Sequence, residues 1–314
     1  MAGLPTRPLG DSGMEVSVIG LGCNQFGRRL DLEGTRAVVD TALELGVTFF
    51  DTADIYGGQG KSEEYLGELL EGRRDEVVLA TKFGLDMGDG KGPRGSRDYI
   101  LQASDASLRR LRTDVVDVYY YHRPDGVTPI KETLATLNEL VQAGSVRVIA
   151  ASNFSAEQID EAEEVARGHG FARFVAIQNE YNLLVRDAEP AVIPACERLG
   201  LGFVPFYPLA GGLLTGKYRQ GETGPPGARL TDRDHIATDQ QYQTIAELER
   251  YADERGRSMI DVGIGALLAR PVIASVIAGA TGPEQVRTNA AAAEWRPSDE
   301  DLAELARLLG PPSP

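Results

Sequence analysis

The chain has 314 residues, of which 42% are hydrophobic and 25% are charged, as is usual for a protein that folds around a core. Its formal net charge of −15 disfavours nucleic acid as a partner, because an acidic surface repels phosphate backbones. Cys23 and Cys196 are too few for a disulfide framework, and we find neither a secretion signal nor a membrane-spanning stretch. We therefore expect a cytoplasmic protein with no membrane partner. The sequence does not specify an oligomeric state.

The first predicted element is a β-hairpin. Residues 6–16 surround Asp11-Ser12-Gly13, a sequence that favours a tight turn. We expect this hairpin to close the bottom of the structure that follows.

Short β-rich runs then recur, each followed by a polar turn and a segment with apolar residues at helical spacing, which is typical of repeated βα units. The predicted strands are residues 18–21, 48–50, 77–81, 115–121, 147–151, 174–178, 202–206 and 272–278. The predicted helices between them are residues 35–45, 62–70, 130–143, 157–166 and 283–293, with two additions at 242–254 and 298–309.

Eight strands with helical connections predict an α/β fold of the (β/α)₈ TIM barrel type, in a single domain spanning residues 1–314. An open doubly wound sheet is the alternative, but no Gly-x-Gly-x-x-Gly turn follows the first strand. Residues 211–241 are rich in Gly, Pro, Thr and Asp and show little periodicity. A loop this long inside a compact domain is usually functional, and this one would lie at the C-terminal face of the barrel.

Polar side chains follow three consecutive predicted strands. Asp51 follows the second strand, Lys82 the third and His122 the fourth, and Tyr56 lies in the loop five residues after Asp51. Because the carboxyl ends of barrel strands form one face, where barrel active sites are built, we expect these side chains to meet.

Each of these four residues also has an ordinary structural explanation, such as a helix cap, a loop aromatic, a surface charge or a polar pocket filler. Together they are suited to proton donation, with the phenol of Tyr56 as the donor and the other three residues around it. A free phenol has a pKa near 10, and a nearby ammonium such as that of Lys82 lowers it. Asp51 would hold Lys82 charged, while His122 would hydrogen-bond the substrate oxygen or the phenol. The cluster therefore favours reduction of a carbonyl group.

Several longer motifs occur in one order along nearly the whole chain. They are Asp51-Thr52-Ala53-Asp54-Ile55-Tyr56-Gly57, Thr81-Lys82, His122-Arg123-Pro124-Asp125, Ala151-Ser152-Asn153-Phe154, Gln178-Asn179-Glu180-Tyr181-Asn182, residues 208–218, and Gly279-Ala280-Thr281 through Pro283-Glu284-Gln285 to Asn289. With these motifs the chain resembles the aldo-keto reductase family, near its bacterial branch and the potassium-channel β-subunit group. The resemblance implies a catalytic tetrad of Asp51, Tyr56, Lys82 and His122, an NADP(H) cofactor, an aldehyde or ketone substrate (or the corresponding alcohol), and no metal.

The resemblance also implies which residues hold the cofactor. Gly22, Cys23 and Asn24 would lie beside the nicotinamide, together with Asp51. Ser152, Asn153 and Gln178 would hold its carboxamide, and Phe206 would stack on its ring, with Tyr207 where a small serine is common. The pyrophosphate would be wrapped by Leu209, Gly211, Leu213 and Lys217, and the adenosine end held by Gly279, Thr281, Gln285 and Asn289.

Gly279, Ala280 and Gln285 stand where several branches of the family place Lys, Ser and Arg around the 2′-phosphate, so NAD(H) stays open as the cofactor. Two other functions stay open as well. One is a cofactor-binding regulatory module with little turnover, and the other is a barrel enzyme that acts on a phosphorylated substrate without a redox cofactor. Residues 211–217 also match Gly-x-x-x-x-Gly-Lys, but Tyr218 replaces the Ser or Thr that a nucleotide hydrolase needs.

Overall fold

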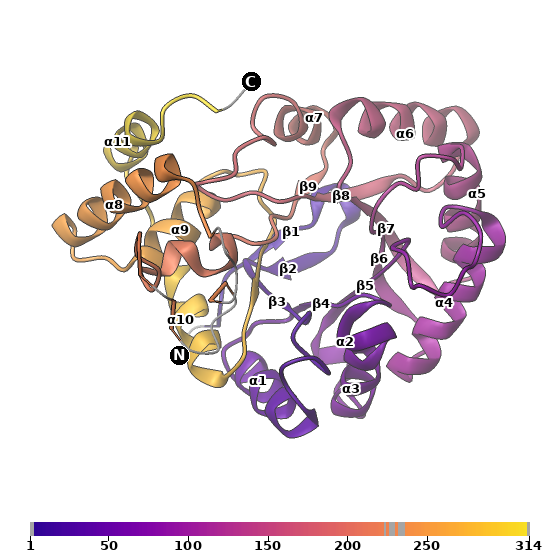
Figure 1. Cartoon of the computed structure of the whole chain (residues 1–314). Coiled ribbons are helices and arrows are strands. Elements are labelled where there is room, and N and C mark those ends of the chain that lie inside the picture. The colour runs from indigo at the N-terminus through magenta and orange to yellow at the C-terminus, as the bar shows by residue number, and fades with distance from the viewer. Residues whose placement is uncertain (1–2, 223, 226–229, 232–235, 313–314) are drawn as a thin grey trace.

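A computed structural model describes residues 3–222, 224–225, 230–231 and 236–312. Eight parallel strands curl into one sheet with helices packed around its outside (Figure 1). Their order across the sheet is β10-β3-β4-β5-β6-β7-β8-β9. The strands are β3 (Ile19–Gly22), β4 (Phe49–Asp51), β5 (Val78–Phe83), β6 (Val116–Tyr121), β7 (Val146–Ser152), β8 (Phe174–Gln178), β9 (Gly202–Phe203) and β10 (Val276–Gly279).

The sheet closes on itself between β9 and the segment that leads into β10. The backbone N–H of Phe203 donates to the carbonyl of Val272 at 2.8 Å, and that of Ile277 donates to the carbonyl of Pro205 at 3.0 Å. Parallel bridges join Phe203 to Ile273 and Phe206 to Ile277. These bonds confirm the (β/α)₈ barrel and rule out the open sheet.

The N-terminal hairpin is also confirmed, as β1 (Thr6–Pro8) paired antiparallel with β2 (Glu15–Ser17). Leu9 and Val16 are fully buried against side chains of the barrel interior such as Phe49 and Val204. Arg7 donates hydrogen bonds to the backbone carbonyls of Leu268, Arg270 and Ile273. The hairpin also meets the chain just before β9, since the N–H of Asp11 donates to the carbonyl of Gly200. It therefore covers the end at which the strands begin.

The helices form the outer layer (Figure 1). They are α1 (Leu32–Glu44), α2 (Tyr56–Gln59), α3 (Lys61–Leu69), α4 (Arg97–Leu111), α5 (Ile130–Gln142), α6 (Ala156–His169), α7 (Val192–Leu199), α8 (Asp239–Glu254), α9 (Met259–Leu268), α10 (Pro283–Ala292) and α11 (Asp299–Leu309). Capping boxes start α6 at Ser155, α8 at Thr238, α9 at Ser258 and α11 at Ser298, so each of these helices begins where the sequence satisfies its first free N–H groups. No helix in the described ranges is long and apolar enough to cross a membrane.

Some elements differ from the sequence-based expectation. β9 ends at Phe203 rather than at residue 206, and β10 begins at Val276 rather than at residue 272. The helices α4, α7 and α9 were not expected, and Tyr56, predicted to lie in a loop, begins the short helix α2. The predicted loop at residues 211–241 overlaps a 3-10 helix (Ala210–Thr215), and within it residues 223, 226–229 and 232–235 lie outside the described residues.

Candidate active site

A cavity of about 850 Å³ lies at the carboxyl ends of the strands. Its walls include the last residues of β3, β4, β7, β8 and β10, namely Gly22, Asp51, Ser152, Gln178 and Gly279. Its volume falls within the range of about 300–1,000 Å³ that is usual for small-molecule sites. It occupies the face of the barrel where the sequence places the site.

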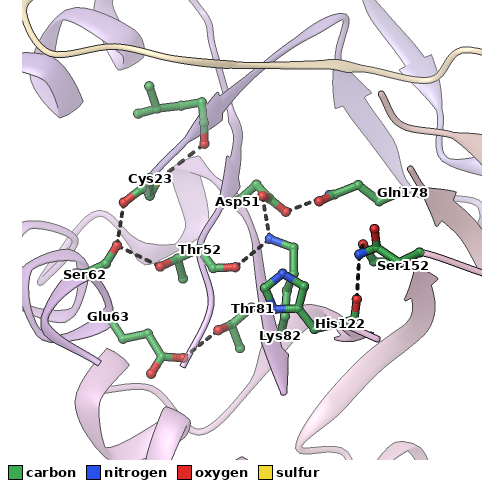
Figure 2. Close-up of polar contacts among 12 residues, drawn as sticks. Cys23, Asp51, Thr52, Ser62, Glu63, Thr81, Lys82, His122, Ser152 and Gln178 are labelled. Atoms are coloured by element: carbon green, nitrogen blue, oxygen red, sulfur yellow. Dashed lines mark hydrogen bonds and ion pairs between the residues drawn. The ribbon is translucent and has the colours of Figure 1, made fainter. Parts of the chain in front are cut away.

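A buried ion pair lies beneath this cavity. Lys82 is completely buried on β5, and its Nζ donates to Asp51 Oδ2 at 2.6 Å and to the carbonyl oxygen of Thr52 at 2.9 Å (Figure 2). The other carboxylate oxygen of Asp51 accepts a hydrogen bond from Gln178 Nε2 at 2.9 Å. Three strands therefore hold one carboxylate and one ammonium in fixed positions, as the sequence predicts for Asp51 and Lys82.

Tyr56 lies over this pair. Lys82 Nζ is 5.1 Å from the centre of the phenol ring. Burial raises the pKa of Tyr56, and the ammonium of Lys82 opposes this without reversing it. The net direction is upward, contrary to the lowering that the sequence suggests, because removal of the hydroxyl from water outweighs the nearby charge. Tyr56 therefore keeps its proton at neutral pH.

Lys82 itself stays charged. Burial alone would lower the pKa of this ammonium, but the charge of Asp51 and the hydrogen bond from Lys82 to Asp51 raise it above its usual value. The expectation that Asp51 keeps Lys82 charged thus agrees with the electrostatics of the site.

His122 completes the group from the end of β6. Its ring lies edge-on to that of Tyr56, with 5.9 Å between the ring centres and 84° between the planes. Burial, followed by the positive charges of Lys82 and Arg123, holds the pKa of His122 well below its usual value. The imidazole is therefore neutral, and its buried Nδ1 has no hydrogen-bond partner among the described residues. A neutral imidazole can hydrogen-bond a substrate oxygen without adding a charge to the site.

The start of α3 supports these strand ends from behind, which the sequence did not reveal. Ser62 Oγ lies 2.8 Å from Thr52 Oγ1 and donates to the carbonyl of Cys23 at 2.9 Å (Figure 2). Glu63 is fully buried, accepts a hydrogen bond from Thr81 Oγ1 at 2.5 Å and pairs with Arg110 at 2.6 Å. These contacts fix the residues directly next to Asp51 and Lys82.

A second buried carboxyl lies near Glu63. Asp54 is only 2% exposed, and its Oδ1 has no partner among the described residues. Burial and the negative charge of Glu63 raise the pKa of Asp54 to about 8, while Arg110 and Arg94 oppose the shift. This carboxyl is therefore largely protonated at neutral pH.

The cavity brings together nearly all of the predicted cofactor residues. Those that line it are Gly22, Cys23, Asn24, Asp51, Ser152, Asn153, Gln178, Phe206, Tyr207, Leu209, Gly211, Lys217, Gly279, Thr281, Gln285 and Asn289. Leu213 does not line it and is instead buried with Leu214 and Tyr218. Hydroxyl and amide groups, an aromatic ring and the cation of Lys217 suit a dinucleotide, which offers an amide, a flat ring and phosphates.

Two hydrogen-bonded pairs order the wall of the cavity. Asn153 Nδ2 donates to the carbonyl of His122 at 2.9 Å and to Ser152 Oγ at 3.0 Å, so it connects the predicted carboxamide site to the backbone of His122. At the predicted adenosine end, the backbone N–H of Thr281 donates to Gln285 Oε1 at 2.7 Å.

Further lining residues fall outside the predicted cofactor set. Gln25, Arg29, Leu85 and Arg123 also line the cavity, and all four lie outside the strands. Thr215 lies in the loop predicted at residues 211–241, whereas Glu180, Ile260 and Thr288 were not foreseen as lining residues. Ile260 belongs to α9, so its place could not be anticipated without that helix.

Comparison with known proteins matches residues 18–309 to the model of the aldo/keto reductase family. The chain is 34% identical to a probable voltage-gated potassium channel subunit beta of Arabidopsis thaliana, over 93% of this chain and 92% of that protein. It is 35% identical to L-glyceraldehyde 3-phosphate reductase of Escherichia coli, over 90% and 86% of the two chains. It is 33% identical to the aldo-keto reductase YhdN of Bacillus subtilis, over 96% and 92%.

The barrel and the cavity at its carboxyl face, together with these reductase relatives, define an NAD(P)H-dependent oxidoreductase that acts on small carbonyl compounds. The chain belongs to the aldo/keto reductase family.

Proposed function

We propose that the protein reduces an aldehyde or ketone to an alcohol with NADPH, and that Tyr56 donates the proton. The observation that carries this proposal is the buried Asp51–Lys82 ion pair, which lies directly under the Tyr56 ring in the cavity wall. A dihydronicotinamide, when bound, supplies the hydride, and a proton must then reach the carbonyl oxygen.

Each polar residue has a defined part in the proposed reaction. Tyr56 holds its proton at the hydroxyl because burial raises the pKa of the phenol. As the carbonyl oxygen gains negative charge, this hydroxyl transfers the proton, and the Lys82 ammonium stabilises the phenolate that is left. Asp51 keeps Lys82 oriented, and the neutral His122 directs the carbonyl oxygen toward Tyr56 through a hydrogen bond.

NADPH is the proposed reductant, with a modest preference over NADH. Thr281, Gln285, Thr288 and Asn289 line the predicted adenosine end of the cavity, and all are polar and uncharged. They can donate hydrogen bonds to a 2′-phosphate, but this described stretch of the wall contributes no cationic side chain to pair with the phosphate charge. We expect Kd values for NADPH and NADH that differ by less than about 100-fold.

Two measurements test the function. Oxidation of NADPH, followed by absorbance with a panel of reactive aldehydes, should show turnover that requires both the enzyme and the aldehyde. Quenching of the Trp295 or tyrosine fluorescence by NADPH reports binding independently. Tight binding without turnover on any aldehyde would contradict catalysis and favour a regulatory module. Absence of NADPH binding would favour an enzyme without a redox cofactor.

A further inference from the structure

Arg123 lines the catalytic end of the cavity. It directly follows His122, and both line the same wall as Tyr56 and Leu85. Its positive charge, after burial and the charge of Lys82, helps to lower the pKa of the His122 imidazole. Nothing in the proposed proton transfer uses this cation.

The turn that carries Arg123 is held firmly. The Asp125 carboxylate accepts hydrogen bonds from the backbone N–H groups of Gly95, Val127 and Thr128 and from the Thr128 hydroxyl, at 2.7–3.0 Å. The backbone N–H of Asp125 donates to the Tyr121 hydroxyl at 2.9 Å. The backbone on both sides of Arg123 is therefore fixed, and the side chain starts from a defined point.

Arg123 has no carboxylate partner within ion-pair distance in the described part of the chain. This chain has 47 acidic and 32 basic residues, so acids to neutralise an arginine are plentiful. Other arginines do have such partners, since Arg94 pairs with Asp86 and Asp89, and Arg110 pairs with Glu63. An unpaired guanidinium beside the catalytic group is available for an anion that comes from outside the protein.

We infer that Arg123 is a specificity-determining residue that binds an anionic group of the substrate, so that the preferred substrates are short aldehydes or ketones bearing a phosphate or a carboxylate. A guanidinium can hold either group through two parallel hydrogen bonds. This inference rests on the proposed carbonyl reduction, because it places the carbonyl group at Tyr56 and His122.

Arg123 directly follows His122 and both line the cavity, so a small substrate whose carbonyl lies at His122 can also contact Arg123. Glu180 also lines the cavity, and we expect the anionic group at Arg123 rather than beside this carboxylate.

Arg123→Met tests the inference through a comparison of charged and neutral substrates. For glyceraldehyde 3-phosphate and succinic semialdehyde, we expect kcat/KM to fall about 10- to 100-fold, mainly through KM. For glyceraldehyde and butyraldehyde, we expect a change below about 3-fold. Arg123→Lys should recover part of the loss. Arg36→Met is the matched control, because Arg36 is exposed on α1 outside the cavity. It should leave kcat/KM unchanged for both the anionic and the neutral substrates.

A binding measurement decides the same question without turnover. Glycerol 3-phosphate, but not glycerol, should raise the melting temperature of the wild-type NADP⁺ complex, and Arg123→Met should abolish this shift. Comparing the phosphate and carboxylate substrates identifies which anion is preferred, and either preference agrees with the inference. Equal losses on neutral and anionic aldehydes, weaker NADP⁺ binding by the variant, or a glycerol 3-phosphate shift that survives the substitution would overturn it. Absence of turnover on every aldehyde would refute the carbonyl reduction, and the melting shift would still decide the role of Arg123.

Discussion

At Tyr56, burial and a neighbouring ammonium act on the same proton in opposite directions. The sequence indicates the neighbour, because Lys82 and Asp51 both stand where a strand ends, but it cannot show how deeply the hydroxyl is buried. The positions of the four polar residues were therefore predictable, whereas the sign of the pKa shift was not. The burial of the carboxyls of Asp54 and Glu63 was likewise not predictable from the sequence, because it depends on how α3 packs.

Asp54 gives a pH-dependent prediction. In the unfolded chain this carboxyl ionises near pH 4, whereas the folded protein keeps its proton to about pH 8. Between these values the folded state binds more protons, so the free energy of unfolding falls as the pH rises, by up to about 1.4 kcal/mol per pH unit. Asp54→Asn cannot ionise, and it should flatten this slope. Urea unfolding at pH 5 and pH 8 measures the difference, and identical slopes in both proteins would refute the assignment.

At the scale of elements, the presence and order of the eight strands and of the capped amphipathic helices were predictable, because hydrophobic period and turn chemistry are local. The helix α9 was missed because it is apolar almost all round, with seven buried residues in ten and hence little periodicity. α4 was missed because Ser104 and Ser107 occupy buried positions where the pattern requires apolar residues. α7 is only eight residues long and contains Pro194. In all three, tertiary packing decides the structure.

The short turn after Tyr56 gives a prediction with a matched pair of glycines. Gly57 has φ +72°, and a Cβ there would lie 2.5 Å from the carbonyl oxygen of Phe26 and 2.9 Å from the N of Ser62. Gly58 has φ +80° with no atom within 4 Å of such a Cβ. Gly57→Ala should cost more than about 2 kcal/mol of stability and lower kcat at least about 10-fold, because the turn that carries Tyr56 must shift.

Gly58→Ala should cost only about 1 kcal/mol, from backbone strain alone, and leave kcat within about 3-fold. Urea unfolding and steady-state kinetics on both variants make the comparison. Equal effects at the two positions would contradict the view that close packing around Gly57 positions Tyr56.

At the scale of the whole molecule, the hairpin and the active site lie at opposite ends of the barrel, so the contribution of the hairpin to stability can be tested without changing the active site. Leu9 is fully buried in the barrel interior, whereas Val127 is 69% exposed. Leu9→Ala should lower the free energy of unfolding by about 2–5 kcal/mol, and Val127→Ala by less than about 0.5 kcal/mol. Because the side chain of Leu9 packs into the barrel interior, we propose that residues 1–314 unfold as one domain. Two separate unfolding transitions would contradict this.

The count of eight βα units could predict the barrel, because it is a property of the entire chain. Neither this count nor the composition could reveal that Arg123 has no carboxylate partner among the described residues, since that depends on contacts between distant segments. The proposed preference for an anionic substrate therefore depends on the assembled molecule.

The most direct test of the account is single-turnover reduction by Tyr56→Phe, with NADPH binding measured on the same samples. Phenylalanine keeps the ring over the Asp51–Lys82 pair and removes only the proton. We predict a loss of turnover of about 10²- to 10⁴-fold, with the Kd for NADPH changed less than about 3-fold. A variant that reduces aldehydes at the wild-type rate would contradict the central claim that Tyr56 supplies the proton.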